Sequence, residues 1–374
     1  MYITKCCATP VFGTRIIDSH AHIGKLKDTN FDKTHLEPFL NKLPNGDKVE
    51  KIIVSDLDVI QGFKSQKTQN ENLLKLFSNS DKYALLAACN VKEDVASMRE
   101  LLVENKGKIL GLKFHPHLQN VPITDVKYKP YFDLAKEQKL PCLIHTAVDL
   151  TKDGMHSGQL EKFADPKSIY EVAKNYKKTP FVMAHLGSGW KDAHRYTTDI
   201  IIESIKKGDA NLYADISWVD IDHTVDNKPS KENLINAIKR LKGIGEKDWK
   251  YGDQSFRLMF GSDAPIDRFA DPKTRIDSYN RYIEEIKTAI RSDIDLEKDA
   301  EKIIDDLFFN NAKKLYKIKD SNRELKTSEK VLKFFSKNIG KLAISSIVVF
   351  AGIMALCYCQ DKNKRSKPNL SLVG

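Results

Sequence analysis

The sequence predicts an α/β protein, a (β/α)8 barrel of the TIM type followed by a single C-terminal transmembrane helix. Between Arg15 and Ser262, eight short apolar or β-branched runs alternate with stretches of helical period, which is typical of βα units around a parallel sheet. Residues 342–359 form a separate run without a charged side chain. An open, doubly wound sheet is the alternative, but no Gly-rich phosphate turn follows an early strand.

The eight predicted strands are rich in Ile, Val, Leu and aromatic residues, and they begin at Arg15, Lys51, Tyr83, Ile109, Pro141, Pro180, Asn211 and Arg257. The predicted helices between and after them cover residues 69–77, 94–105, 128–139, 166–177, 197–207, 231–241 and 272–291. Each helix is amphipathic, so one face can pack on the sheet.

The chain has 374 residues and a formal net charge of +10, which is unevenly distributed. From Ala312 onward there are 14 Lys and Arg against 4 Asp and Glu, out of 61 and 51 in the whole chain, so residues 1–311 carry 47 of each sign. A neutral body argues against a nucleic-acid groove, and no nucleic acid is expected as a partner. The six cysteines form no C-x-x-C pair, which fits a reducing cytoplasm.

The predicted organisation has five parts: a lead-in (1–14), the barrel (15–316), a basic polar linker (317–341), the transmembrane helix (342–359) and a short basic tail (360–374). A helix over 342–359 would be about 27 Å long, close to the hydrocarbon thickness of a bilayer. A buried core helix is the alternative, disfavoured because the lysine-rich linker separates this run from the barrel. Basic residues flank both ends, so charge bias does not set the orientation, and without an export signal the barrel is expected in the cytoplasm.

Histidine and aspartate residues gather where the predicted strands end, which is the end at which barrel enzymes place their chemistry. His20 and His22, two apart on the first strand, share a face and can bind one ion. His145 ends the fifth strand and Asp263 ends the eighth, so they can supply a third nitrogen and a carboxylate oxygen. Such a set without thiolate suits Zn²⁺, with Mn²⁺, Fe²⁺ or Co²⁺ as alternatives. The pattern indicates a divalent metal site at the barrel mouth.

The motifs DSHAH, GLKFHPHLQ, LIHTA, MAHLG and MFGSDAP follow one another within residues 15–316. In this order they resemble the amidohydrolase superfamily, and within it the amidohydrolase 2 group of metal-dependent barrel hydrolases and decarboxylases. The resemblance implies that His20, His22, His145 and Asp263 bind the metal. Such an ion lowers the pKa of its water from 15.7 to about 7, and the resemblance implies that His185 and Asp263 act as catalytic residues that transfer protons. The expected activity is hydrolysis of a small carboxylated or cyclic substrate, with decarboxylation as the alternative.

The resemblance leaves the number of ions open. Some superfamily members carbamylate a lysine of the fourth strand, which then bridges two metals, and Lys113 with His145 and His185 would complete such a set. In the amidohydrolase 2 group the G-x-K-x-H-P stretch usually accompanies one metal, with the residues at Lys113 and His115 lining the substrate pocket. We expect one ion, with Zn²⁺ as the first choice.

The substrate is expected among the loops after the fifth, sixth and seventh strands, where Trp190, Arg195 and Trp218 can stack on it or pair with it. The first and last motifs also resemble TatD-type nucleases, but Lys113 occupies the nearest strand on which that family usually offers a glutamate. A catalytically silent, membrane-tethered scaffold is a further alternative, disfavoured by the intact ligand set. The expected partners are a small molecule and, through residues 342–359, a membrane, while a homodimer is left open.

Overall fold

The computed structural model describes residues 13–41, 43–146, 163, 165–187, 193–217, 219, 224–225, 228–244, 256–266 and 269–319. The chain divides into two units, Met1–Ile318 and Lys319–Gly374, and every element below belongs to the first. Its centre is a nine-stranded sheet with the order β11-β8-β7-β6-β5-β4-β3-β1-β2. Eight strands are parallel, and β2 (Thr29–Phe31) is antiparallel to β1. The parallel strands are β1 (Arg15–Leu26), β3 (Lys48–Asp56), β4 (Tyr83–Ala88), β5 (Ile109–Phe114), β6 (Cys142–Ile144), β7 (Pro180–Met183), β8 (Asn211–Asp215) and β11 (Leu258–Met259).

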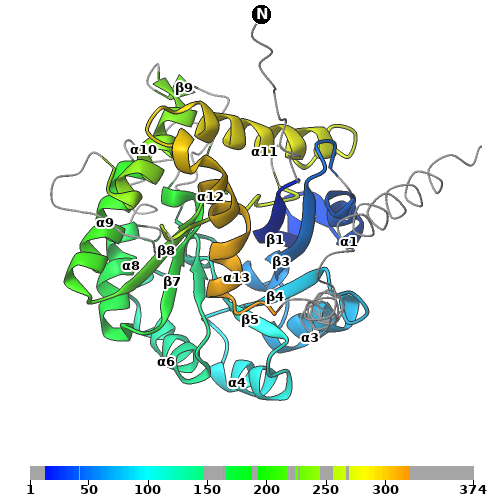
Figure 1. Cartoon of the computed structure of the whole chain (residues 1–374). Coiled ribbons are helices and arrows are strands. Elements are labelled where there is room, and N and C mark those ends of the chain that lie inside the picture. Colours follow the sequence, from blue (N-terminus) through cyan, green and yellow to red (C-terminus); the bar gives the residue numbers. More distant parts are fainter. Residues whose placement is uncertain are drawn as a thin grey trace, which may run out of the picture. The chain divides into compact units, whose positions relative to one another are not determined.

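Hydrogen bonds between the first and last parallel strands close this sheet into a barrel (Figure 1). Ala21 of β1 forms a parallel bridge with Ala264, beyond the end of β11. Next to this bridge, the Asp263 N–H donates to the His20 carbonyl at 2.8 Å. A closed set of eight parallel strands brings the residues at the ends of β1 and β11 side by side, although they are far apart in the sequence.

Helices surround the barrel and cover the outer face of its sheet (Figure 1). The main helices are α3 (Gln66–Leu76), α4 (Val95–Glu104), α6 (Lys129–Gln138), α8 (Pro166–Ala173), α9 (Ala193–Lys207), α10 (Ser230–Lys242) and α11 (Arg275–Ser292). Side-chain caps fix the start of two of them: Asp94 accepts from the Ala96 N–H at 3.0 Å, and Asp165 accepts from the Lys167 N–H at 2.9 Å.

Shorter elements connect these layers. They are α1 (Lys33–Leu36), α2 (Leu57–Ile60), α5 (Pro116–Gln119), α12 (Ala300–Asp305) and α13 (Asn311–Leu315), the 3-10 helices η1 (Glu37–Leu40), η2 (Val126–Tyr128), η3 (Lys174–Tyr176), η4 (Ala184–Gly187) and η6 (Glu297–Asp299), the π-helix η7 (Asp306–Asn310), and the paired strands β9 (Thr224–Val225) and β10 (Lys228–Pro229).

The barrel end at which the strands begin is closed by η7 and α13, which lie in front of the barrel in Figure 1. Phe309, Ala312 and Leu315 pack on apolar residues from the strands, namely Ile17, Ile53, Ala84, Leu86, Leu143, Val182 and Met259. The Asn311 side chain adds a polar anchor, because its Nδ2 donates to the Leu258 carbonyl at 2.7 Å. With this end filled, the barrel offers its opposite end, where the strands finish, for chemistry.

The α/β prediction is confirmed, and each of the eight predicted strand runs contains an observed strand. The seven predicted helices each overlap an observed helix, while β2 and α1 were not predicted. Within the part of the chain that is described, no helix combines the length and the apolar character needed to cross a membrane. The predicted transmembrane helix at 342–359 and the tail at 360–374 lie outside the described residues, as does most of the linker.

Candidate metal centre

Three buried side chains meet between the middle of β1 and the residues that follow β11, so His20 and His22 do not end their strand as predicted, because β1 continues to Leu26. His20 and His22 lie on the inner face of β1, and their Nε2 atoms are 3.1 Å apart. Asp263 follows β11, and its Oδ1 is 3.1 Å from each of these nitrogens. None of the three side chains is more than 8% exposed. The H-x-H spacing and the closing of the barrel therefore direct two imidazoles and one carboxylate at the same space.

The second nitrogen of each imidazole is held by another strand. His20 Nδ1 is 3.0 Å from Asp215 Oδ2 on β8, and His22 Nδ1 is 3.0 Å from Ser55 Oγ on β3. Burial alone would raise the pKa of Asp215, but His20 and His185 hold it below its usual range, so Asp215 is ionised. Because a carboxylate only accepts, His20 carries its proton on Nδ1 and presents the Nε2 lone pair to the centre.

This geometry fits a divalent cation. Because the proton of His20 is on Nδ1, no hydrogen bond joins its Nε2 to the Asp263 carboxylate, and yet the two atoms are only 3.1 Å apart. Ligand atoms about 2.0–2.1 Å from a common ion lie roughly 3.0–3.4 Å from one another. His20, Asp263 and His185 also offer ligand atoms that are all within 4.8 Å of one another. The donor set of imidazole nitrogen and carboxylate oxygen is one that Zn²⁺ and Mn²⁺ accept.

Uncommon backbone conformations position two of these side chains. Asp263 has a φ of +63° and His185 a φ of +62°, in the left-handed region that costs a non-glycine residue about 1–2 kcal/mol. The His185 N–H donates to Asp215 Oδ1 at 3.0 Å, which supports its conformation. Gly261 makes room for the imidazole opposite, because a Cβ at this position would lie 2.8 Å from the Cβ of His20. Strain of this kind is typical of functional sites.

A second pair of imidazoles lies beside the first. His185 Nε2 is 3.0 Å from His145 Nδ1, and Ser217 Oγ is 2.9 Å from His185 Nδ1. The resemblance implied that His145 binds the ion and that His185 transfers protons. In the structure, however, His185 is the residue that shares the 4.8 Å group with His20 and Asp263. Both roles stay predictions, and either imidazole can complete the ligand set.

Lys113 lies among the candidate ligands. It projects inward from β5, it is fully buried, and its Nζ is 2.7 Å from His20 Nε2. Burial lowers the pKa of Lys113 to about 8, although Asp263 and Asp215 oppose this shift. The predicted pocket residue His115 is buried at the start of α5, where it stacks on His145 with ring centroids 3.7 Å apart. Lys113 therefore contacts the candidate ligand His20 directly, and His115 packs against the second pair of imidazoles.

Burial lowers the pKa of three imidazoles in the centre. It lowers the pKa of His20 to about 3, and the charge of Lys113 acts in the same direction. It also lowers the pKa of His185 and brings that of His145 well below its ordinary value. For Asp263, burial alone would raise the pKa, but the neighbouring histidines hold it below the usual range. Neutral imidazoles beside an ionised carboxylate are the protonation states that bind a metal cation.

A family model for amidohydrolases matches residues 17–318 of the sequence. The chain belongs to the amidohydrolase family. Its sequence has no match among curated proteins.

The amidohydrolase fold of this chain is similar to several solved structures. A putative amidohydrolase from Staphylococcus aureus is 12% identical with a TM-score of 0.53, over 82% of this chain and 100% of that chain. The 5-carboxyvanillate decarboxylase from Sphingomonas paucimobilis is 12% identical with a TM-score of 0.51, over 82% and 100%. The 5-carboxyvanillate decarboxylase from Novosphingobium aromaticivorans, in a structure with bound manganese, is 12% identical with a TM-score of 0.50, over 82% and 98%. At these identities the likeness shows a common fold.

The predicted substrate residues of this amidohydrolase are only partly described. Trp190 and Trp218 lie outside the described residues. Arg195 lies on α9 with a side chain that is 74% exposed, and its Nε is 4.0 Å from Asp199 Oδ2, one helical turn away. Arg195 thus forms an ion pair on the surface of α9, and a role in substrate binding stays a prediction.

Three polar residues of the amidohydrolase site were not predicted: Asp215 and Ser217 at the end of β8, and Ser55 near the end of β3. The signal for the first two was present, because they stand two apart at the end of the run NLYADIS, as His20 and His22 do at the end of theirs. Ser55 ends the run KIIVS in the same way. Their oxygens contact the imidazole nitrogens that face away from the centre. This role can be recognised only when it is known which strands are neighbours in the barrel.

Proposed function

We propose that this amidohydrolase is a metal-dependent hydrolase that cleaves a small carboxylated or cyclic substrate with an activated water molecule. The observation that carries the proposal is the 3.1 Å spacing of His20 Nε2, His22 Nε2 and Asp263 Oδ1, with the only proton of His20 on the side of Asp215. A similar fold holds manganese in the Novosphingobium decarboxylase, which supports a divalent ion, and Zn²⁺ is our first choice.

In this proposal His20, His22 and Asp263 hold one divalent ion, and His145 or His185 completes the set. The ion, when bound, supplies Lewis acidity and lowers the pKa of a water molecule toward neutrality. Asp215 fixes the tautomer of His20, and Ser55 fixes the ring of His22 through a 3.0 Å contact. These outer contacts hold the imidazoles before any ligand arrives, so little reorganisation is needed.

The second pair of imidazoles is suited to move a proton. His185 Nε2 and His145 Nδ1 are 3.0 Å apart, so one of them donates and the other accepts. Ser217 Oγ, 2.9 Å from His185 Nδ1, continues this chain of hydrogen bonds. The imidazole of the pair that does not bind the ion can therefore take up a proton and release it toward a leaving group.

Decarboxylation is the second candidate. Two of the similar structures are decarboxylases of an aromatic acid, and the same residues can bind a carboxylated ring and deliver a proton to its carbon atom. The two candidates differ in product, because only the decarboxylase releases carbon dioxide.

The partners proposed with this activity are a small-molecule substrate and, through residues 342–359, a lipid bilayer that anchors the chain. The support for the anchor is the uncharged run in the sequence between basic flanks.

The test uses the full-length protein purified without chelator and analysed for bound metal. We expect about one equivalent of a divalent ion, and turnover of a member of a panel of small amides, lactones and aromatic acids that stops with chelator and returns with added zinc or manganese. His20→Ala and Asp263→Ala should lose both metal and turnover. His35→Ala is the matched control, because it removes an imidazole from α1, outside the centre. A protein that binds no divalent ion would overturn the proposal.

A further inference from the structure

The barrel end at which the strands begin carries a cluster of lysines in three successive loops. The segments that lead into β5, β6 and β7 read NKGK (105–108), KLP (139–141) and KKT (177–179). They contain five lysines and no carboxylate, and all five lysines are exposed. Because β5, β6 and β7 are neighbours in the sheet, these loops lie side by side at one end of the barrel.

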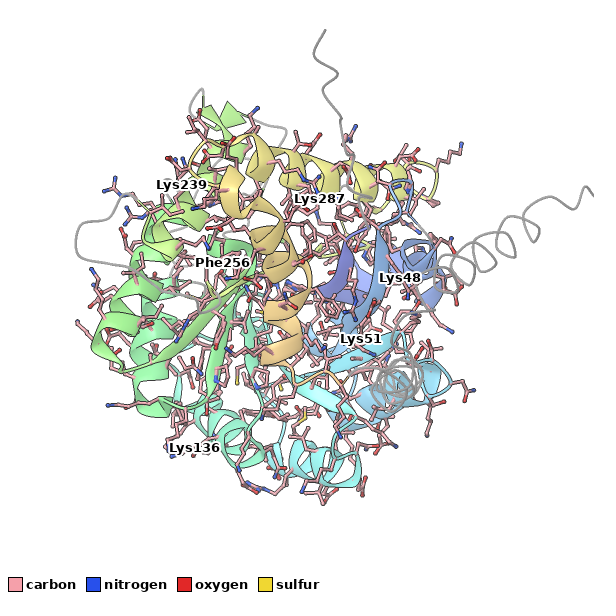
Figure 2. The ribbon with its side chains drawn as sticks, in the orientation of Figure 1. Lys48, Lys51, Lys136, Lys239, Phe256 and Lys287 are labelled. Carbon is pink, nitrogen blue, oxygen red and sulfur yellow. The ribbon has the colours of Figure 1, made fainter. Side chains whose placement is uncertain are left out.

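The C-terminal helix of the barrel adds to this cluster. Lys314 of α13 and Lys317 after it are both exposed, and Lys317 Nζ is 3.4 Å from the Lys139 carbonyl. We refer to Lys106, Lys108, Lys139, Lys177, Lys178, Lys314 and Lys317 as the basic rim. Figure 2 shows the molecule with α13 in front of the barrel. Lys48 and Lys51 of β3, which are labelled there, are not part of the basic rim.

Few carboxylates offset this charge. Among the described residues, none of the seven ammonium groups of the basic rim forms an ion pair with a carboxylate. Two acidic residues lie within four positions of these loops in the sequence. Glu137 is already bound to Arg99, and Glu104, at the end of α4, is the other. Since residues 1–311 carry equal numbers of each sign, the excess at this end is balanced elsewhere on the barrel.

The sequence that follows the basic rim favours a lipid partner over other polyanions. After Ile318 the chain continues through residues 320–341, with six Lys and Arg against three Asp and Glu, into the uncharged run 342–359. A cationic surface that precedes such a run in the chain matches the pattern of basic segments next to anionic headgroups. The candidate metal centre lies at the other end of the barrel, so a partner at the basic rim leaves the centre open.

We propose that the basic rim binds the headgroups of an anionic lipid membrane, with the metal-centre end of the barrel facing water. This docking surface belongs to the barrel itself and does not depend on the reaction proposed above. Each lysine near an anionic surface contributes about 1 kcal/mol, or roughly fivefold in the partition coefficient. The interaction weakens with salt, because the Debye length falls from about 10 Å at 0.1 M to about 3 Å at 1 M.

The test is lysine footprinting of the full-length protein on lipid vesicles. The protein is incubated with vesicles of neutral phosphatidylcholine, or of phosphatidylcholine with about one third phosphatidylserine, and acylated briefly with an amine reagent before mass spectrometry. We expect the lysines of the basic rim to react at least threefold more slowly on the anionic vesicles, and to recover in 1 M salt. Lys27, Lys92 and Lys127, which are exposed in the segments that follow β1, β4 and β5, should react equally on both. Because labelling is read residue by residue, the result does not depend on whether 342–359 inserts.

Two variants separate the surface from net charge. Replacing Lys108, Lys139, Lys178 and Lys317 by Gln should remove at least two thirds of the protection at the remaining rim lysines. The control variant replaces Lys27, Lys64, Lys92 and Lys127 by Gln, has the same net charge, and should keep the protection. Equal labelling on neutral and anionic vesicles would overturn the proposal. So would protection by duplex DNA at equal phosphate concentration that exceeds protection by the anionic vesicles, because it would assign the surface to nucleic acid.

Discussion

Replacing Asp215 by Asn tests the reasoning about the centre most directly. Asp215 Oδ2 accepts from His20 Nδ1 at 3.0 Å, and Oδ1 accepts from the backbone N–H groups of His185 and Ser217, each at 3.0 Å. An amide of the same shape can keep the oxygen on the backbone side, but it turns an N–H group toward His20. That ring must then carry its proton on Nε2, which removes the lone pair that faces the centre.

The magnitude follows from the role of the lost contact. Removing a carboxylate that orients a metal-bound histidine typically lowers metal affinity 10- to 100-fold, which corresponds to about 1.4–2.7 kcal/mol. The free energy of unfolding without metal should fall by about 1.5–3 kcal/mol, because hydrogen bonds to a charged group are lost from a buried site.

The assay is a competition titration of the full-length protein and the Asp215→Asn variant against a chromophoric chelator, with zinc and then manganese. The matched control is Asp47→Asn, since Asp47 is also buried but binds Lys287 and the Thr14 N–H, away from the centre. We expect the control to lose stability and to keep its metal affinity. If Asp215→Asn bound either metal as tightly as the parent protein, the tautomer argument would be wrong.

Three further predictions concern the packing behind His20, a buried ion pair and the C-terminal run. Gly261→Ala should lower metal affinity at least tenfold in the same titration, because the new Cβ would lie 2.8 Å from His20 Cβ, and unchanged affinity would contradict the close packing. Lys287→Met should lower the free energy of unfolding, measured in urea, by about 3–5 kcal/mol. The reason is that Asp47 stays buried without its partner Lys287 on α11, which is 2.7 Å away and is labelled in Figure 2. A loss below about 1 kcal/mol would refute this. Deleting residues 342–374 should move the protein from the membrane fraction to the supernatant after alkaline extraction, whereas an unchanged distribution would exclude the predicted anchor.

The barrel could be predicted because its signals are local. Each strand is a short β-branched run, and each polar residue at a strand end stands at the place where the barrel collects side chains from all its strands. His20, His22 and Asp263 were predicted in this way to lie close together, although they are far apart in the sequence. Predicting such a cluster requires only the order of the strands along the chain, and not the register in which they pair.

What was missed depends on contacts between particular strands. Asp215 looks like an ordinary strand end until the closed barrel places it 3.0 Å from His20 Nδ1. Lys113 was predicted to line a pocket, but its position against His20 follows from its inward direction on β5 and from its burial. Which of His145 and His185 lies nearer the centre likewise depends on backbone conformation. The positive φ of His185 turns its side chain in a direction that the spacing of residues in the sequence does not reveal.

The closure of the barrel also determines how late during its synthesis the chain can complete the sheet. Ser19 Oγ donates to the Phe260 carbonyl at 2.6 Å, and the two residues are 241 positions apart. At a synthesis rate of about 5–20 residues per second, roughly 12–48 s separate their emergence from the ribosome. Throughout this interval one edge of β1 has no strand to pair with, and His20 and His22 lack their carboxylate. The candidate metal centre therefore stays incomplete until Asp263 has been synthesised, and a chaperone that shields this edge would protect the nascent chain from aggregation.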